Sequence, residues 1–252
     1  MIYPHSRFFV ALLVLAGFAA AARAELPIIA KARAHLGSEA ALNSVKSIHF
    51  VGQLTSADPA DKNVVSVEIF FQKPYRQRVV SKDGKGGVQV TTLDNYDAWQ
   101  RVEVPGNPPR WSLTQSDKEQ IKRLRASTWE NLEFYRGIER EGGRLQDLGD
   151  ASIDGVACRK LAFIHAENMI FYRYLEKASG RLVLTETESG ATIREQGEII
   201  VDGIRFPKSI ITAVKLAQGG TQTITITFST ITVNEALDDG LFANPIYSPS
   251  AK

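Results

Sequence analysis

Between residues 145 and 233 the sequence alternates apolar and polar residues and is interrupted at regular intervals by turn-forming residues. Alternation with a period of two is typical of β-strands that have one covered face. The pairs Asp154-Gly155 and Asp202-Gly203 are the strongest turn signals, because these residues tolerate the positive φ angles of a tight hairpin. No alternation of strands with helices occurs in this half, so the pattern predicts consecutive antiparallel hairpins.

The first half of the chain contains the same alternation in shorter runs. Lys73-Pro74 ends one of them, since proline cannot donate a hydrogen bond to a strand ladder. A glycine-rich loop, residues 82–87, joins two others. It lacks the spacing of a phosphate-binding loop and no helix follows it, which favours a flexible hairpin. The strands predicted here cover residues 47–53, 65–71, 76–81, 88–93 and 98–104.

Helical periodicity occurs in only two places. Residues 27–45 predict one helix, or two short helices broken near Gly37-Ser38. A capping box formed by Ser116 and Glu119 predicts the start of the second helix, which extends to about residue 136.

The second predicted helix carries an apolar stripe that includes Ile121, Leu124 and Trp129. Such a stripe fits ordinary core packing, and it also fits a movable cover over a cavity. The sequence leaves both interpretations open.

The amino terminus has the three-part layout of a secretory leader. A short basic region precedes an apolar run from Phe8 to Ala22, and Ala22-Arg23-Ala24 places small residues where a signal peptidase reads them. The run of 15 residues is shorter than the roughly 20 that cross a bilayer. We therefore expect cleavage after Ala24 and a mature protein in the periplasm, with one domain over residues 25–246 and a loose tail over 247–252.

Charge and cysteine content limit the classes of partner. The chain has 30 Lys and Arg against 28 Asp and Glu, but Arg7 and Arg23 belong to the leader, so the mature chain is balanced. A neutral surface gives no reason to expect nucleic acid as a partner. Cys158 is the single cysteine, which excludes an internal disulfide. No cysteine that could be acylated follows the leader. We also expect the protein to be a monomer.

Few residues suggest catalysis. The histidines after the leader, His35, His49 and His165, have no metal-ligand spacing, and no serine-nucleophile motif occurs. Glu186 and Glu188 share the parity of one strand and could form a carboxylate pair, but surface acids on a half-solvated sheet explain them as well. We expect no enzyme activity, no metal and no cofactor.

Apolar and aromatic residues are instead in excess on the long strands. If their alternating positions share one concave surface, two helical segments leave that surface partly unfilled, and an apolar cavity results. An ordinary sandwich core explains the pattern equally well. The candidate cavity residues are Val67, Ile69, Phe71, Phe163, Tyr172, Tyr174, Leu182, Leu184, Ile226 and Phe228.

The order of these elements resembles the LolA-like superfamily, the periplasmic lipoprotein carriers and outer-membrane lipoprotein-sorting proteins. The features that carry the resemblance extend over the whole mature chain. They are the basic-Pro pair Lys73-Pro74, the Asp-Gly hairpins, the stretch Val201 to Pro207 and the ending Phe242 to Pro245.

The resemblance implies a mainly β fold with some α-helix, an incomplete antiparallel β-barrel or curved sheet with a helical lid. It also implies lipid or lipoprotein acyl chains as ligands, with a donor in the inner membrane and an acceptor in the outer membrane. In the lipoprotein carrier an arginine precedes the proline and ties the lid to backbone carbonyls. Lys73 occupies that position here, and an ammonium group lacks the planar fork of a guanidinium.

Three functions follow from these observations. The leading one is a periplasmic carrier, a transport protein or chaperone for lipids or lipoproteins in outer-membrane biogenesis. The second is a module for envelope-stress sensing or assembly that binds a protein partner. The third is an enzyme that acts on a small apolar substrate, for which Glu186, Glu188 and His165 would be the residues to test.

Overall fold

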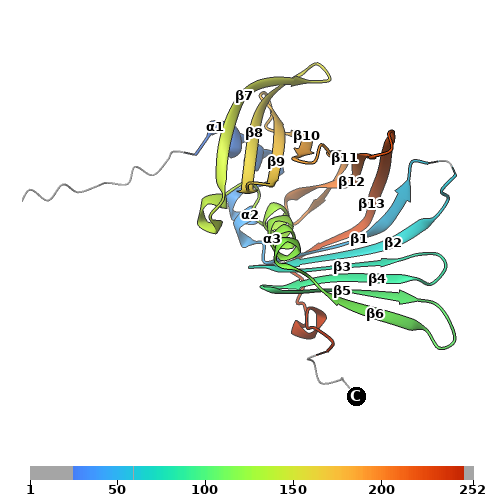
Figure 1. Ribbon diagram of the computed structural model, residues 1–252. Coiled ribbons are helices and arrows are strands. Elements are labelled where there is room, and N and C mark those ends of the chain that lie inside the picture. The colour runs from blue at the N-terminus through green and yellow to red at the C-terminus, as the bar shows by residue number, and fades with distance from the viewer. Residues whose placement is uncertain (1–24, 59, 247–252) are drawn as a thin grey trace, which may run out of the picture.

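The alternating segments form thirteen strands that pair in one antiparallel sheet (Figure 1). The structure is a computed structural model that describes residues 25–58 and 60–246, so the predicted leader and the predicted tail lie outside the described residues. The strands of the first half are β1 (Ser47–Ser56), β2 (Val64–Gln72), β3 (Arg76–Lys82), β4 (Val88–Asp94), β5 (Asp97–Val104) and β6 (Arg110–Gln115). Those of the second half are β7 (Arg144–Ile153), β8 (Val156–Ala166), β9 (Met169–Glu176), β10 (Leu182–Thr187), β11 (Thr192–Val201), β12 (Ile204–Lys215) and β13 (Thr221–Val233).

The sheet is curved and open. Its strand order is β6-β5-β4-β3-β2-β1-β13-β12-β11-β10-β9-β8-β7, so β6 and β7 are its two edges. Almost every neighbouring pair is a hairpin, and the long-range pairing of β1 with β13 joins the two halves. The prediction of a mainly β, incomplete antiparallel barrel is confirmed.

Three α-helices accompany the sheet in the described part of the chain: α1 (Pro27–Leu36), α2 (Glu39–Ser44) and α3 (Lys118–Leu132). The predicted break near Gly37-Ser38 separates α1 from α2, and Ser38 caps α2 through the Ala41 amide. The capping box of α3 is formed by Asp117 and Gln120, one residue after the predicted pair. Two short 3₁₀ segments complete the set, η1 (Ile138–Glu141) and η2 (Asp239–Leu241). None of the helices in the described ranges is long and apolar enough to span a bilayer.

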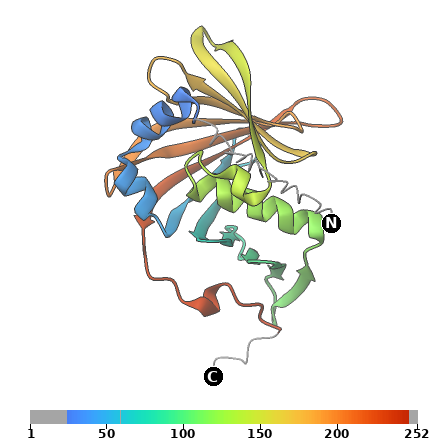
Figure 2. The same ribbon diagram turned by 90° about the vertical axis from the view of Figure 1, so that its left-hand side faces the viewer.

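Helix α3 lies across the hollow of the curved sheet (Figure 2). Its Thr128 hydroxyl is 3.2 Å from Gln77 Oε1 of β3, which identifies the side of the sheet that faces the helix. We call this side the inner face. Because residues that oppose each other in an antiparallel ladder share a face, the pairing registers place Phe71, Ile48 and Val233 on it as well.

The core divides into two clusters on the inner face. One surrounds Phe50 and Phe206, contacts α2 and includes Leu132 at the end of α3. The other joins Ile29 and Ala32 of α1 to Trp129 of α3 and to strands β8 and β9. All three helices therefore bury their apolar residues against the inner face. A smaller cluster around Cys158 and Tyr174 lies on the opposite side of the sheet, the outer face.

Candidate functional site

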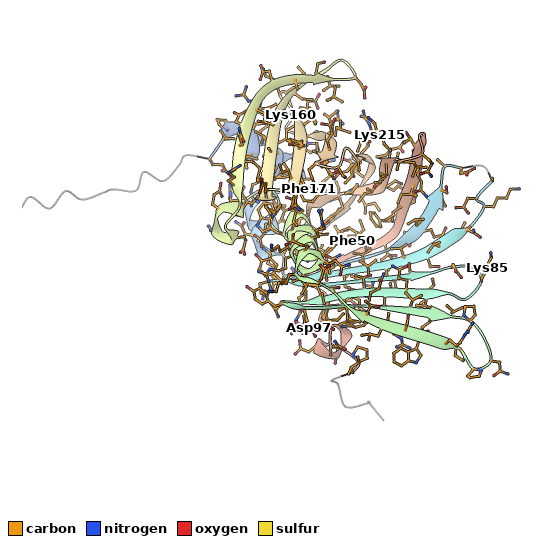
Figure 3. The ribbon with its side chains drawn as sticks, in the orientation of Figure 1. Phe50, Lys85, Asp97, Lys160, Phe171 and Lys215 are labelled. Carbon is orange, nitrogen blue, oxygen red and sulfur yellow. The ribbon has the colours of Figure 1, made fainter. Side chains whose placement is uncertain are left out.

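A cavity lies beneath α3, between the two core clusters, and we call it the main cavity for this central place and not for its volume. It has a volume of about 280 Å³, close to the lower end of small-molecule pockets. Phe50 of β1 and Phe171 of β9 both line it, and Figure 3 shows both rings on the side of α3. Most of its accessible lining is apolar. The lining residues are Leu36, Phe50, Ser127, Glu130, Asn131, Phe134, Tyr135, Phe171, Arg173, Leu182, Thr185, Ile193, Glu195, Arg205, Phe206, Pro207 and Ile210.

A second space, which we call the side cleft, adjoins the main cavity. Its volume is about 310 Å³, and it shares Leu182, Glu195 and Arg205 with the main cavity. Strands β10 and β11 pair through only Thr185↔Ile193 and Glu186↔Thr192, whereas β11 and β12 pair along nearly their whole length. The two strands thus diverge beside the cavity, and the side cleft occupies the gap between them.

The inner wall of the main cavity holds a buried ionic network. Glu130 of α3 forms a salt bridge with Arg173 of β9, and its other oxygen is 2.6 Å from Nε2 of His165. The Arg173 guanidinium also lies 4.6 Å from the ring centroid of Tyr135 and 5.0 Å from that of Phe163. All three charged or polar side chains are more than nine-tenths buried. Such groups require partners, and the Glu130 carboxylate supplies one to Arg173 and one to His165, whereas Nε of Arg173 has no partner in the described part of the chain.

Glu195 of β11 differs from this network. Its side chain is exposed to solvent, lines both the main cavity and the side cleft, and makes no hydrogen bond or salt bridge with another residue of the described ranges. A polar group in this position is available to a ligand.

The carboxyl end of α3 is fixed by Arg33 of α1, whose side chain is 1% exposed. Arg33 Nη1 donates to the carbonyl oxygens of Glu133 at 3.2 Å and Phe134 at 2.8 Å. Phe134 and Tyr135 have φ angles of +48° and +73°, a left-handed conformation that is costly for bulky residues. Arg33 therefore stabilises a strained segment that closes one end of the main cavity.

The same arginine forms a two-pronged pair with Glu39, with Nε and Nη2 each 2.8 Å from a carboxylate oxygen. This hydrogen-bonded pair, aided by Arg136, lowers the pKa of the Glu39 carboxyl to about 2. Arg136 in turn holds Glu25, the residue that follows the expected cleavage site. The cluster of Arg33, Glu39 and Arg136 thereby links α1, α2 and the end of α3.

Lys73, the predicted lid latch, also lies next to the carboxyl end of α3. Its Nζ is 3.0 Å from Glu133 Oε1, just beyond the last turn of α3. The contact is an ion pair with a side chain, whereas the carbonyl hydrogen bonds come from Arg33. Sequence reasoning missed Arg33, because Lys31 and His35 flank it in the same helix and nothing in the sequence separates the buried cation from its neighbours.

The candidate cavity residues fall on both faces of the sheet. The pairing registers place Val67, Ile69, Phe71, Phe163, Leu182, Ile226 and Phe228 on the inner face. Tyr172, Tyr174 and Leu184 lie on the outer face, where Lys160 is 4.8 Å from the ring centroids of both tyrosines. Of the ten, Leu182 alone lines the main cavity, and the other inner residues pack in the core.

The lid candidates also lie outside the cavity wall. Trp129 packs against Phe163 and His165, and Ile121 and Leu124 are half-buried. Helix α3 instead presents Ser127, Glu130 and Asn131 to the cavity. The apolar stripe thus forms the attachment of the helix, and the polar positions between its members face the hollow.

The residues considered for catalysis do not converge. Glu186 accepts a hydrogen bond from the Tyr174 hydroxyl on the outer face, Glu188 pairs with Arg123, and His165 belongs to the inner network. Within the described ranges no cluster of His, Cys, Asp and Glu has the arrangement of a metal site. Desolvation raises the pKa of the buried Cys158 thiol, which disfavours the reactive thiolate.

No family model matches this sequence, and no curated protein matches it either. Solved structures do share its fold. A LolA superfamily protein from Nitrosomonas europaea is 14% identical with a TM-score of 0.55, covering 86% of this chain and 96% of its own. A domain from Vibrio parahaemolyticus described as an outer membrane lipoprotein-sorting protein is 12% identical, with a TM-score of 0.54 and coverage of 85% and 94%.

A DUF1329 family protein from Desulfovibrio piger is 10% identical, with a TM-score of 0.52 and coverage of 88% and 98%. Each of these matches covers at least 85% of this chain. The chain therefore has the fold of the LolA superfamily.

Proposed function

We propose that this protein is a carrier that binds lipid or lipoprotein acyl chains in the cell envelope. The observation that carries the proposal is the main cavity, a largely apolar hollow between a curved sheet and α3, with a side cleft that opens next to it. Burial of an acyl chain gains about 0.8 kcal/mol per methylene group, so a hollow of this kind binds without many polar contacts. The place of α3 over the hollow, with only its second half buried against the sheet, and the strained segment after it support the assignment of α3 as a lid.

The proposed location is the periplasm, after removal of residues 1–24. The secretory pattern of the leader supports it, and so does the shared fold with a domain described as an outer membrane lipoprotein-sorting protein. A donor in the inner membrane and an acceptor in the outer membrane belong to the same proposal. The protein is proposed to act as a monomeric carrier without catalysis.

The experiment is uptake of a fluorescent fatty-acyl probe, combined with native mass spectrometry of protein purified from its own host. Ser127 of α3 lines the main cavity, so Ser127→Phe fills the hollow and is expected to weaken probe binding at least tenfold. The matched control is Ser152→Phe on the exposed edge strand β7, which is expected to bind as the wild type does. No uptake by wild-type protein together with no copurified lipid would refute the carrier proposal.

A further inference from the structure

The segment that follows α3 presents two bulky side chains to the main cavity. Phe134 and Tyr135 both line it, and both have the left-handed φ angles given above. Residues in this region of φ and ψ persist only where the surrounding structure holds them, and they cluster at ligand sites. Arg33 supplies that hold through the Phe134 carbonyl oxygen. A strained backbone in contact with a cavity directs attention to the side chains that it places there.

Tyr135 brings a polar atom into this largely apolar space. The residue is only 8% exposed, yet its hydroxyl makes no hydrogen bond with another residue of the described ranges. Its ring is held in place, with the Arg173 guanidinium 4.6 Å from the ring centroid and the centroid of the Phe163 ring 6.0 Å away. Leaving a buried hydroxyl without a partner is costly. The Tyr135 hydroxyl is therefore available to a partner from outside the chain.

The surroundings of Tyr135 indicate where this hydroxyl points. The residue also lines the side cleft and a third space beside Leu145. The charged groups that act on its hydroxyl are Arg173, Glu195 and Glu130, all of which line the main cavity, so the hydroxyl lies on the main-cavity side. Burial raises the pKa of the hydroxyl above its ordinary value of 10. The group thus keeps its proton at neutral pH and acts as a hydrogen-bond donor.

We propose, on the basis of the carrier function above, that the Tyr135 hydroxyl is the polar subsite of the main cavity and donates a hydrogen bond to the carbonyl oxygen of an acyl chain. The ligand class is then an ester- or amide-linked acyl chain rather than a plain hydrocarbon or an ether. Each oxygen of the buried Glu130 carboxylate already has a partner, Arg173 for one and His165 for the other, which leaves the hydroxyl to the ligand. The apolar lining, which includes Phe171, takes the methylene groups.

The test compares methyl dodecanoate with dodecyl methyl ether by displacement of a fluorescent acyl probe from the protein. The two ligands have chains of equal length, and only the ester has a carbonyl oxygen. Tyr135→Phe removes the hydroxyl and keeps the ring, so the preference for the ester over the ether should fall by about three- to tenfold, the value of one hydrogen bond. Because each ligand is measured on both proteins, their different solubilities cancel. The matched control Tyr96→Phe, at a position that is 75% exposed between β4 and β5, should keep the wild-type preference.

Infrared spectroscopy of the bound ester gives a second measurement that needs only the wild-type protein. A hydrogen-bonded carbonyl group absorbs at a lower frequency than the same ester in hexane. We therefore expect a lowered carbonyl band in the wild type and in Tyr96→Phe, and a band that returns toward its hexane position in Tyr135→Phe.

An unchanged preference in Tyr135→Phe, or a wild-type carbonyl band at the hexane position, would overturn this inference and leave the carrier function standing. Failure of the probe and of both ligands to bind the wild type would overturn the carrier function, and the inference with it. Circular dichroism of each variant establishes that it is folded. The wild-type band tests the proposal even if Tyr135→Phe does not fold.

Discussion

At the scale of single residues, Arg33 contributes most to the closed arrangement of the helices. Its guanidinium is buried and serves four groups: the carbonyls of Glu133 and Phe134, the Glu39 carboxylate and the Asn43 side chain. Lysine cannot reproduce this set, because an ammonium group lacks the planar fork that reaches several acceptors at once. One side chain from α1 thus fixes both α2 and the strained segment after α3.

Arg33→Ala is expected to lower the free energy of unfolding by about 3 kcal/mol or more, because it leaves buried carbonyl groups without a donor. The matched control is Arg136→Ala. Arg136 binds the same Glu39 carboxylate but is about two-fifths exposed, and its loss should cost under about 1 kcal/mol. Urea denaturation of both variants measures the difference. Equal losses would mean that the carbonyl hydrogen bonds add nothing to the shared ion pair.

The pairing of Glu39 also predicts a pH dependence. Its carboxyl pKa of about 2 in the folded protein lies below the ordinary value of 4.5. A lowered pKa means that the ionised form stabilises the fold above pH 4.5 and that this contribution is lost as the pH falls toward 2. Urea midpoints measured between pH 5 and pH 2 should fall less steeply for Glu39→Gln than for the wild type. Identical slopes would contradict the prediction.

At the scale of elements, the sequence predicted the strands well and their faces poorly. Alternation identified nearly all the strands because one covered face imposes a period of two. It missed β6, an edge strand whose residues are almost all exposed and therefore need no apolar alternation. Leu182 and Leu184 have the same parity, yet a bulge between them turns one inward and the other outward. Local sequence does not encode such a register shift.

The site was harder to predict for the same reason. Along β9 the aromatic side chains of Tyr172 and Tyr174 suggested the buried face, but the other parity holds Phe171, Arg173 and Leu175 and faces α3. Arg173 is tolerated there because Glu130, which is 43 positions away in the sequence, reaches it in space. A buried polar network depends on tertiary neighbours, so a single sequence does not show that Glu130, His165 and Arg173 meet.

The packing of α1 against the β9–β10 turn supplies an element-scale prediction. A Cβ atom at Gly180 would lie 2.5 Å from the backbone of Lys31 and Ala32, at a φ of +80°. Gly190 has the same φ in the next hairpin, with nothing within 4 Å of its Cβ position. Gly190→Ala should cost about 1 kcal/mol, the penalty of the left-handed conformation alone. Gly180→Ala should cost about 1–3 kcal/mol more, because it displaces α1.

Thermal unfolding of the two alanine variants, followed by circular dichroism, measures this difference. Hydrogen exchange adds a second readout, since a displaced α1 should lose protection over Pro27–Leu36 in Gly180→Ala and keep it in Gly190→Ala. Equal stability of the variants would show that α1 does not rest on this turn. Such a result would also weaken the assignment of α1 as a fixed wall of the side cleft.

At the scale of the whole molecule, the arm of the sheet formed by β2 to β6 is supported on both of its faces. Residues 234–246, which we call the strap, leave β13 and run across the outer face of β3 to β5 (Figure 1). Arg78 donates to the carbonyl oxygen of Leu241 at 2.8 Å, and the Arg76 guanidinium lies 5.6 Å from the ring centroid of Phe242. Asn244 reaches Gln115 of the edge strand β6. The strap thus packs on the outer face of this arm, and α3 packs on its inner face.

Phe242 is the anchor of the strap, since its side chain is fully buried. Phe242→Ala should lower the free energy of unfolding by about 3–5 kcal/mol, the usual cost of removing a buried ring. Ile246→Ala, at an exposed position near the end of the strap, should change it by less than about 0.5 kcal/mol. Because the strap contacts one arm, hydrogen exchange in Phe242→Ala should rise first in β3 to β6 and leave β8 and β9 protected. Uniform loss of protection would mean that the two arms unfold as one unit, and that the curvature around the cavity depends on the whole sheet rather than on separate supports for each arm.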